Sequence, residues 1–133
     1  MFGVLVVDDN KIFRELLRDL LLLNYPSVEV YEASNGEEAI QKVESHFPGL
    51  ILMDIHLGGG ENGLKIAEKI RQAGHSDVKI AILTSFDLPE YKEAAMEYGF
   101  EYFFIKGLST LEDIRTLVGS VLAEREVTHS LPC

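Results

Sequence analysis

The sequence is poor in cysteine, in basic residues and in long apolar runs. Because Cys133 is its single cysteine, no disulfide can form within the chain, which favours a reducing, cytoplasmic setting. The 12 lysine and arginine residues are outnumbered by 22 aspartate and glutamate residues, which gives a net charge of −10. A chain this acidic repels phosphate backbones and anionic lipid, so we expect it to bind neither nucleic acid nor a membrane surface directly.

No segment has the pattern of a signal peptide or a transmembrane helix. The chain reaches Asp8 almost at once, and the apolar run Leu20 to Leu23 is far too short to cross a bilayer. The length of 133 residues suits a domain that buries its own core. We predict one domain over residues 1–124, followed by a tail or linker stub over residues 125–133, where the helical apolar pattern ends.

Short apolar runs alternate with amphipathic stretches five times along the chain. The runs that predict strands lie at residues 4–7, 28–32, 50–53, 80–83 and 102–105. Apolar residues recur at helical spacing within residues 12–21, 36–47, 64–70, 87–98 and 110–122. A capping box at Ser34-Asn35-Gly36-Glu37 indicates where the second helix begins. Five strand–helix units in succession predict an α/β fold, a parallel sheet with helices on both faces.

The pattern within each run also predicts its place in the sheet. Residues 50–53 and 80–83 have no polar interruption, as expected of strands buried on both faces. Residues 28–32 alternate in polarity, which predicts an edge strand. We therefore expect a five-stranded parallel sheet of order 2-1-3-4-5, doubly wound and flavodoxin-like.

Polar side chains follow four of the five predicted strands. The carboxyl ends of parallel strands meet at one edge of the sheet, where ligands bind at the point at which the strand order reverses. We expect these groups to converge there: Asp8 and Asp9, Asp54, Thr84 with Ser85, and Lys106. Each alone has an ordinary interpretation, as a helix cap, a loop acid, a strand-end hydroxyl bonded to backbone, or a lysine that protects an edge strand. Their joint occurrence favours a shared site.

The chemistry of these groups indicates a phosphoryl acceptor. Three close carboxylates repel one another, and Mg²⁺, which prefers carboxylate and phosphate oxygens, relieves that repulsion. Asp54 could attack phosphorus and hold an aspartyl phosphate. The metal and Lys106 would neutralise the transferred group, and the Thr84 hydroxyl could bond one of its oxygens.

In these motifs the chain resembles the receiver domains of two-component response regulators. The resemblance covers about residues 3–123, and residues 87–106 are most similar to receivers of helix-turn-helix transcription factors. The motifs that carry it are Val6-Val7-Asp8-Asp9, Leu52-Met53-Asp54, Leu83-Thr84-Ser85 and Phe104-Ile105-Lys106. The resemblance implies a protein that receives a phosphoryl group from a histidine kinase or phosphotransfer protein and relays it as a change of shape, without being an enzyme.

The resemblance also implies a role for each residue. Asp54 would be the phosphoacceptor. Asp9, Asp54 and the backbone carbonyl of His56 would bind Mg²⁺, with Asp8 acting through metal-bound water. The residues that would bind the phosphoryl group and switch are Thr84, Lys106 and Phe103. Phosphorylation would then alter the affinity of the domain for an output domain or for a second copy in a homodimer.

The resemblance is imperfect near the acceptor. The loop Gly58-Gly59-Gly60-Glu61-Asn62-Gly63 lacks the usual proline and is one residue longer. Gly107 replaces the frequent proline after Lys106, and Phe103 lacks the hydroxyl of the commoner tyrosine.

Two residues near the acceptor should set the lifetime of the phosphorylated state. Phe86, two residues after Thr84, is bulky and apolar and should keep water away. His56, two residues after Asp54, could instead accept a proton from that water. We expect the blocking effect to prevail, which predicts a long-lived phosphoryl group. The alternative is that both side chains are ordinary loop residues turned to solvent.

Two other classes of protein share part of the pattern. A Mg²⁺-dependent phosphohydrolase with an aspartate nucleophile is the main alternative, although such enzymes usually carry a second acid where this chain has His56. A flavin-binding domain of the same topology would need a Ser/Thr-rich phosphate loop after the first strand, where Asp8 and Asp9 would repel phosphate.

Overall fold

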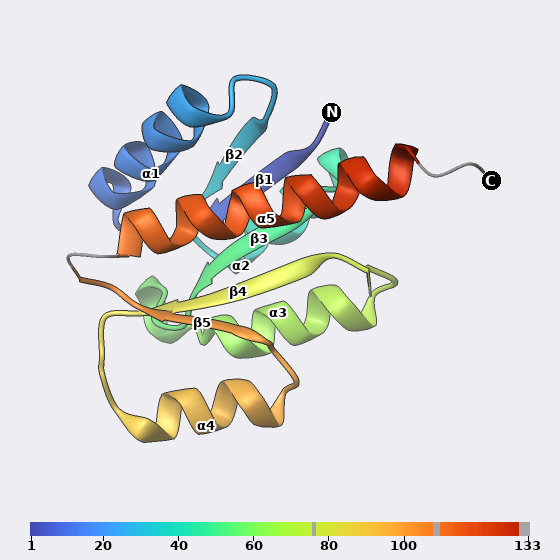
Figure 1. The fold of residues 1–133 in the computed structure, drawn as a ribbon. Helices are drawn as coiled ribbons and strands as arrows, with labels where there is room; N and C mark the ends of the chain where they lie inside the picture. The colour runs from blue at the N-terminus through green and yellow to red at the C-terminus, as the bar shows by residue number, and fades with distance from the viewer. Residues whose placement is uncertain (76, 108–109, 131–133) are drawn as a thin grey trace.

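A parallel sheet forms the middle layer of the protein and carries helices on both faces (Figure 1). The computed structural model describes residues 1–75, 77–107 and 110–130. The strands are β1 (Gly3–Val7), β2 (Glu29–Ala33), β3 (Leu50–Asp54), β4 (Lys79–Thr84) and β5 (Tyr102–Ile105). The helices are α1 (Lys11–Asn24), α2 (Gly36–His46), α3 (Gly63–Gln72), α4 (Pro89–Glu97) and α5 (Thr110–Ser130), with a 3₁₀ turn at Gly58–Gly60.

The strand order is β2-β1-β3-β4-β5 and every ladder is parallel, so the predicted order is confirmed. Strands β1 and β3 are buried along their whole length, whereas β2 is half exposed and lies at an edge, as its alternating sequence predicts. One apolar core forms beneath α1 and α5, and a second beneath α2, α3 and α4. The sheet therefore has a buried centre, and the carboxyl ends of β1, β3 and β4 lie together.

Asparagine side chains cap three of the helices. Asn10 accepts a hydrogen bond from the Phe13 N–H at 3.1 Å, so it caps α1, and neither Asp8 nor Asp9 does. Asn35 caps α2, and Glu38 accepts in return from the backbone N–H of Ser34. The cap is thus Asn35, one residue later than the predicted Ser34, and the carboxylate of Glu38 bonds the residue before the cap rather than the cap itself, as it would in a capping box. Asn62 caps α3 at the end of the glycine-rich loop.

Helix α5 extends further than the sequence pattern indicates. The apolar pattern predicts that regular structure ends near residue 124, but the backbone stays helical to Ser130, so the first part of the predicted 125–133 tail is helical. Residues 123–126 read Ala-Glu-Arg-Glu, which favour a helix without any apolar stripe. An ion pair of Lys79 with Glu124 at 3.4 Å holds this part to the sheet. Residues 131–133, Cys133 included, lie outside the described residues.

Among the described helices, none combines the length and the apolar character needed to cross a membrane.

Candidate metal and phosphoryl site

Three carboxylates gather where β1 and β3 end. One oxygen each of Asp8, Asp9 and Asp54 lies within 4.8 Å of the others. Asp8 is fully buried and Asp54 is 4% exposed, whereas Asp9 faces solvent. The strands place these side chains together because Val7, just before Asp8, pairs in register with Met53, just before Asp54. Oxygen ligands at this spacing suit a hard divalent cation such as Mg²⁺.

Lys106 reaches into the same group from the end of β5. Its ammonium forms an ion pair with Asp8 and lies 3.3 Å from an oxygen of Asp54. The Phe13 ring covers it, with the ammonium 4.5 Å from the ring centre. Lys106 is therefore turned into the site, rather than out to protect the edge strand β5.

Negative charge exceeds positive charge at the site. Burial is the main cause that raises the pKa of Asp54 above its ordinary value, and the negative charge of Asp8 adds to it. The positive charge of Lys106 acts in the opposite direction. One ammonium among three carboxylates leaves an excess of negative charge, which a divalent cation would neutralise.

Backbone and side-chain hydrogen bonds that the sequence did not predict hold these groups in place. The guanidinium of Arg14 donates to the carbonyl of Asp8 at 2.5 Å. Thr110, at the start of α5, accepts from the N–H of Gly107 at 2.6 Å and donates to the carbonyl of Ile105 at 2.8 Å. Thr110 thus fixes the chain on both sides of Lys106. Apolar periodicity carries no signal for such bonds, because they depend on polar atoms that meet only in the folded chain.

The glycine-rich loop folds back on itself beside the carboxylates. The Gly63 N–H donates to the carbonyl of Ile55 at 2.7 Å, and this bond closes the long loop into a turn. Gly59 and Gly60 both have positive φ, which glycine adopts without strain. Glu61 accepts from the Gly36 N–H at 3.0 Å and fastens the loop to the start of α2.

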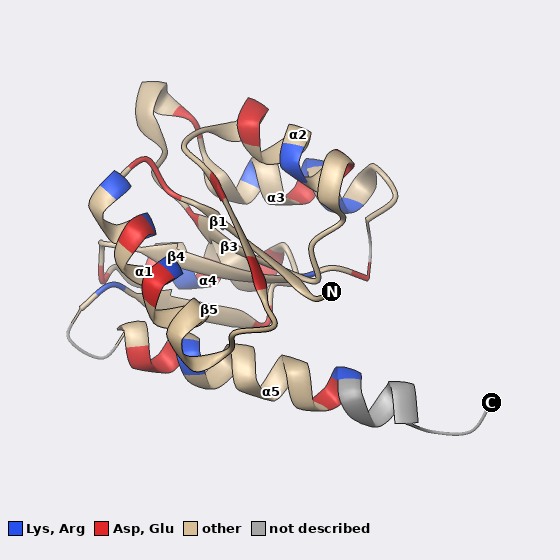
Figure 2. Cartoon of the chain, turned by 90° about the horizontal axis from the view of Figure 1, so that it is seen from above, with Lys and Arg blue, Asp and Glu red and all other residues tan. Residues whose placement is uncertain are grey.

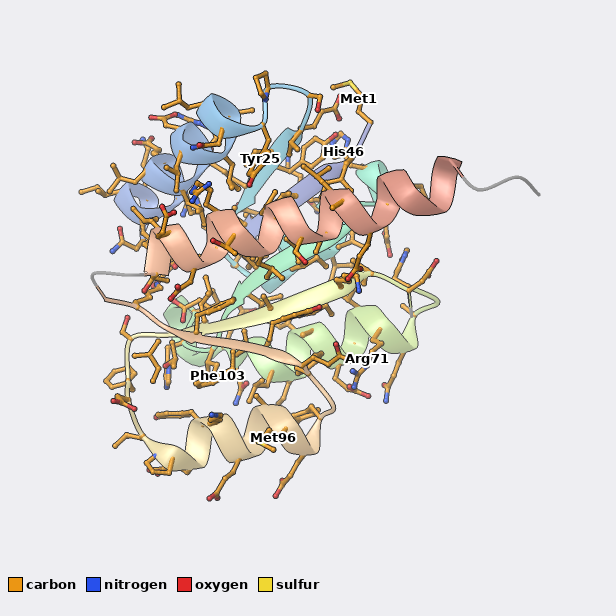
Figure 3. All side chains as sticks on the ribbon, in the orientation of Figure 1. Met1, Tyr25, His46, Arg71, Met96 and Phe103 are labelled. Atoms are coloured by element: carbon orange, nitrogen blue, oxygen red, sulfur yellow. The ribbon has the colours of Figure 1, made fainter. Side chains whose placement is uncertain are left out.

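Thr84 ends β4 fully buried, next to the rim of the site. Its hydroxyl oxygen accepts a hydrogen bond from the Phe86 N–H at 3.1 Å, which is the local backbone bond that the ordinary interpretation of Thr84 anticipated. Phe103 lies on β5, half buried against the core beneath α4 (Figure 3). Its partner in the ladder is Ile82 of β4.

The rim carries three aromatic side chains, His56, Phe86 and Tyr91, which we call the rim cluster. The His56 and Phe86 rings meet edge to face with 4.7 Å between their centres. The Nε2 atom of His56 lies at hydrogen-bond distance, 3.2 Å, from the Tyr91 hydroxyl. Phe86 remains 48% exposed. His56 is exposed as well, so the two side chains pack on each other while both remain open to solvent. No sequence motif points to the part played by Tyr91.

Charged residues are mixed over the rest of the chain. Figure 2 shows basic residues scattered among acidic ones along the described helices and loops.

Comparison with known proteins identifies the family. Residues 4–118 match the model of the response regulator receiver domain. An uncharacterized response regulatory protein of Staphylococcus epidermidis is 31% identical over 128 residues, which cover 94% of this chain and 49% of that protein. The transcriptional regulatory protein DegU of Brevibacillus brevis is 26% identical over 132 residues, covering 96% of this chain and 55% of DegU. The chain thus spans about half the length of these curated relatives.

A solved structure gives the same assignment. The response regulator protein TrrA of Thermotoga maritima, in complex with Mg²⁺ and BeF, is 30% identical with a TM-score of 0.75, covering 91% of this chain and 99% of that one. The sheet order, the three carboxylates at its carboxyl edge and the family match over residues 4–118 all agree. This chain belongs to the response regulator receiver domain family.

Proposed function

We propose that Asp54 accepts a phosphoryl group from the phosphohistidine of a histidine kinase or phosphotransfer protein. The observation that carries the proposal is the meeting of the Asp8, Asp9 and Asp54 carboxylates with the Lys106 ammonium at the carboxyl edge of the sheet. Asp9, Asp54 and the His56 carbonyl would hold Mg²⁺, and Asp8 would act through metal-bound water. When bound, the metal would neutralise charge on the phosphoryl oxygens.

The chain's own groups supply the rest of the transfer. A carboxylate oxygen of Asp54 attacks phosphorus, the bond from phosphorus to the donor ring nitrogen breaks, and its electron pair stays on the donor imidazole. Lys106 lies 3.3 Å from Asp54 and so can pair with a phosphoryl oxygen held there. The product is an aspartyl phosphate that is read as a signal.

Removing Mg²⁺ should abolish this reaction. We expect one labile phosphoryl adduct when the chain is incubated with a small phosphodonor and Mg²⁺, and none when EDTA is added, because the three carboxylates, which Lys106 neutralises only in part, then repel the donor. Intact mass measures the adduct, and base-induced loss tests its acyl phosphate character. Steady hydrolysis of many phosphoesters without an adduct would instead favour the phosphohydrolase that the sequence left open.

The relay would run through β4 and β5. A phosphoryl group on Asp54 would draw Thr84 toward it, and Phe103 would turn inward. The surface of α4, β5 and α5 would then change its affinity for a second copy or for an output domain. Residues 125–133 would serve as a tail or linker stub, whose first part, residues 125–130, continues α5. A histidine kinase takes its phosphoryl group from ATP, which is found in the cytoplasm, so the proposed transfer would take place there.

The Phe86→Ala variant should lose its phosphoryl group several-fold faster than the parent. Hydrolysis needs a water in line with Asp54. The half-exposed Phe86 ring packs on His56, and the backbone N–H of Phe86 is bonded to the Thr84 hydroxyl. Phospho-Asp54 decay is followed by intact mass after the donor is removed, with Phe47→Ala as control, since Phe47 is exposed and follows the end of α2. His56→Ala should decay more slowly if the imidazole assists water. A Phe86→Ala decay no faster than that of the parent rules out shielding.

A further inference from the structure

We propose that Tyr91 is a positioning residue that holds the imidazole of His56. Through this contact, the position of α4 would be coupled to phosphorylation of Asp54. The inference rests on the proposed function of Asp54. Tyr91 has no carboxylate, and it is neither one of the proposed metal ligands nor one of the residues proposed to bind the transferred group.

The contact joins two segments that are far apart in the chain. His56 lies in the loop after β3, and Tyr91 lies in the first turn of α4. Besides the 3.2 Å approach of the Tyr91 hydroxyl to Nε2, the two rings meet at 88°, with 4.9 Å between their centres. Phe86 closes the group, with its ring centre 6.1 Å from that of Tyr91. The rim cluster thus ties α4 to two loops at the site.

The first turn of α4 depends on this tie, because the other core contacts of the helix, made by Ala94, Ala95 and Tyr98, lie in its later turns. Of its residues Pro89–Glu97, Ala95 alone is fully buried. Its N-cap, Leu88, makes no side-chain capping bond. The first turn therefore gains much of its attachment from Tyr91, whose ring packs against the core and whose hydroxyl reaches His56.

Both ring partners of Tyr91 are bonded to the site itself. The backbone N–H of His56 donates to a carboxylate oxygen of Asp54 at 3.3 Å, and the backbone N–H of Phe86 donates to the Thr84 hydroxyl oxygen at 3.1 Å. A phosphoryl group that draws Thr84 toward Asp54 pulls on Phe86, so the rim cluster cannot keep all its contacts. In this proposal the contact that is given up is the His56–Tyr91 bond, which then belongs to the unphosphorylated state and opposes the change.

The coupling is reciprocal. If phosphorylation weakens the bond to Tyr91, then a partner on α4 that displaces Tyr91 must favour phosphorylation by the same factor. Loss of one neutral hydrogen bond changes an equilibrium by about 2- to 10-fold. Tyr91 is thus the residue through which a partner bound at α4 would change the phosphorylation equilibrium of Asp54.

The test compares Tyr91→Phe, which keeps the ring and removes the hydroxyl, with Tyr98→Phe on the same side of α4. The Tyr98 ring packs on Phe100 rather than on the rim cluster. We expect Tyr91→Phe to bind beryllofluoride with Mg²⁺ about 2- to 10-fold more tightly than the parent. We also expect faster amide exchange in the first turn of α4 without beryllofluoride. Tyr98→Phe should match the parent in both measurements.

The double variant separates coupling from general loosening. In His56→Ala, removing the Tyr91 hydroxyl should have no further effect on beryllofluoride affinity, because its partner is already gone. Additive effects, or a Tyr91→Phe protein that behaves like Tyr98→Phe, would overturn the role of Tyr91 while the parent still binds beryllofluoride and the proposed function stands. If the parent forms neither complex nor adduct, the proposed function fails and this inference fails with it.

Discussion

The Asp54→Asn variant should form no phosphoryl adduct and should resist urea better than the parent at neutral pH in the absence of metal. The first effect follows from chemistry, because a neutral amide oxygen is too weak a nucleophile to take the phosphoryl group. The second follows from burial. Asp54 is 4% exposed and lies beside the buried Asp8, so its negative charge is held in an unfavourable place.

The pH dependence of that stability gain has a definite sign. Burial raises the pKa of Asp54 in the folded chain above its ordinary value of 3.8. A raised carboxyl pKa means that the folded state binds the proton more tightly than the unfolded state. The favourable contribution of this proton to folding stability is complete below pH 3.8 and is lost as the pH rises through the folded pKa of Asp54. The advantage of Asp54→Asn should therefore be largest at neutral pH and should vanish in acid.

Two measurements check this prediction. Intact mass after incubation with a phosphodonor and Mg²⁺ should show an adduct on the parent and none on Asp54→Asn. Urea midpoints in EDTA, taken at several pH values, should show the gain for Asp54→Asn but not for Asp87→Asn, which changes an exposed acid. An adduct that persists in Asp54→Asn would disprove the assignment of the acceptor. A gain that grows in acid would contradict the effect of burial.

Residues that act through burial are predictable from the sequence. The uninterrupted run at residues 50–53 predicts a buried central strand, and the alternation at residues 28–32 predicts the edge strand β2. Because strand ends converge in a parallel sheet, the same apolar pattern is enough to bring Asp8, Asp54 and Lys106 together at one edge.

Residues that act through single polar contacts are not predictable. Ser34 and Asn35 are both good caps, and only the folded chain decides that Asn35 bonds the N–H of Glu38. Helical spacing places Tyr91 toward the sheet, yet nothing in it indicates that the hydroxyl would meet His56, which is 35 positions away. The end of α5 differs from its prediction for another reason, since helix propensity extends that helix after its apolar stripe has ended.

Replacing Gly63 with alanine should destabilise the fold by about 3 kcal/mol or more. Gly63 begins α3 where that helix presses on the end of β3, and its N–H donates to the carbonyl of Ile55 at 2.7 Å. A Cβ on Gly63 would overlap the carbonyl oxygen of Asp54, and it would lie 2.8 Å from the carbonyl carbon of Asp54 and 3.0 Å from Cγ of Met53. The first two of these atoms are backbone of the central strand, so they cannot move aside as a flexible side chain would.

Urea unfolding of Gly63→Ala beside Gly107→Ala separates this clash from the general cost of changing a glycine. A Cβ on Gly107 would meet no atom within 4 Å, and its φ is not positive, so that variant should stay within about 0.5 kcal/mol of the parent. Gly63 lies where the long loop after Asp54 returns to β3, so relief of the clash would shift Asp54 itself. A Gly63→Ala protein with unchanged stability and unchanged phosphorylation would show that α3 does not press on β3 in this way.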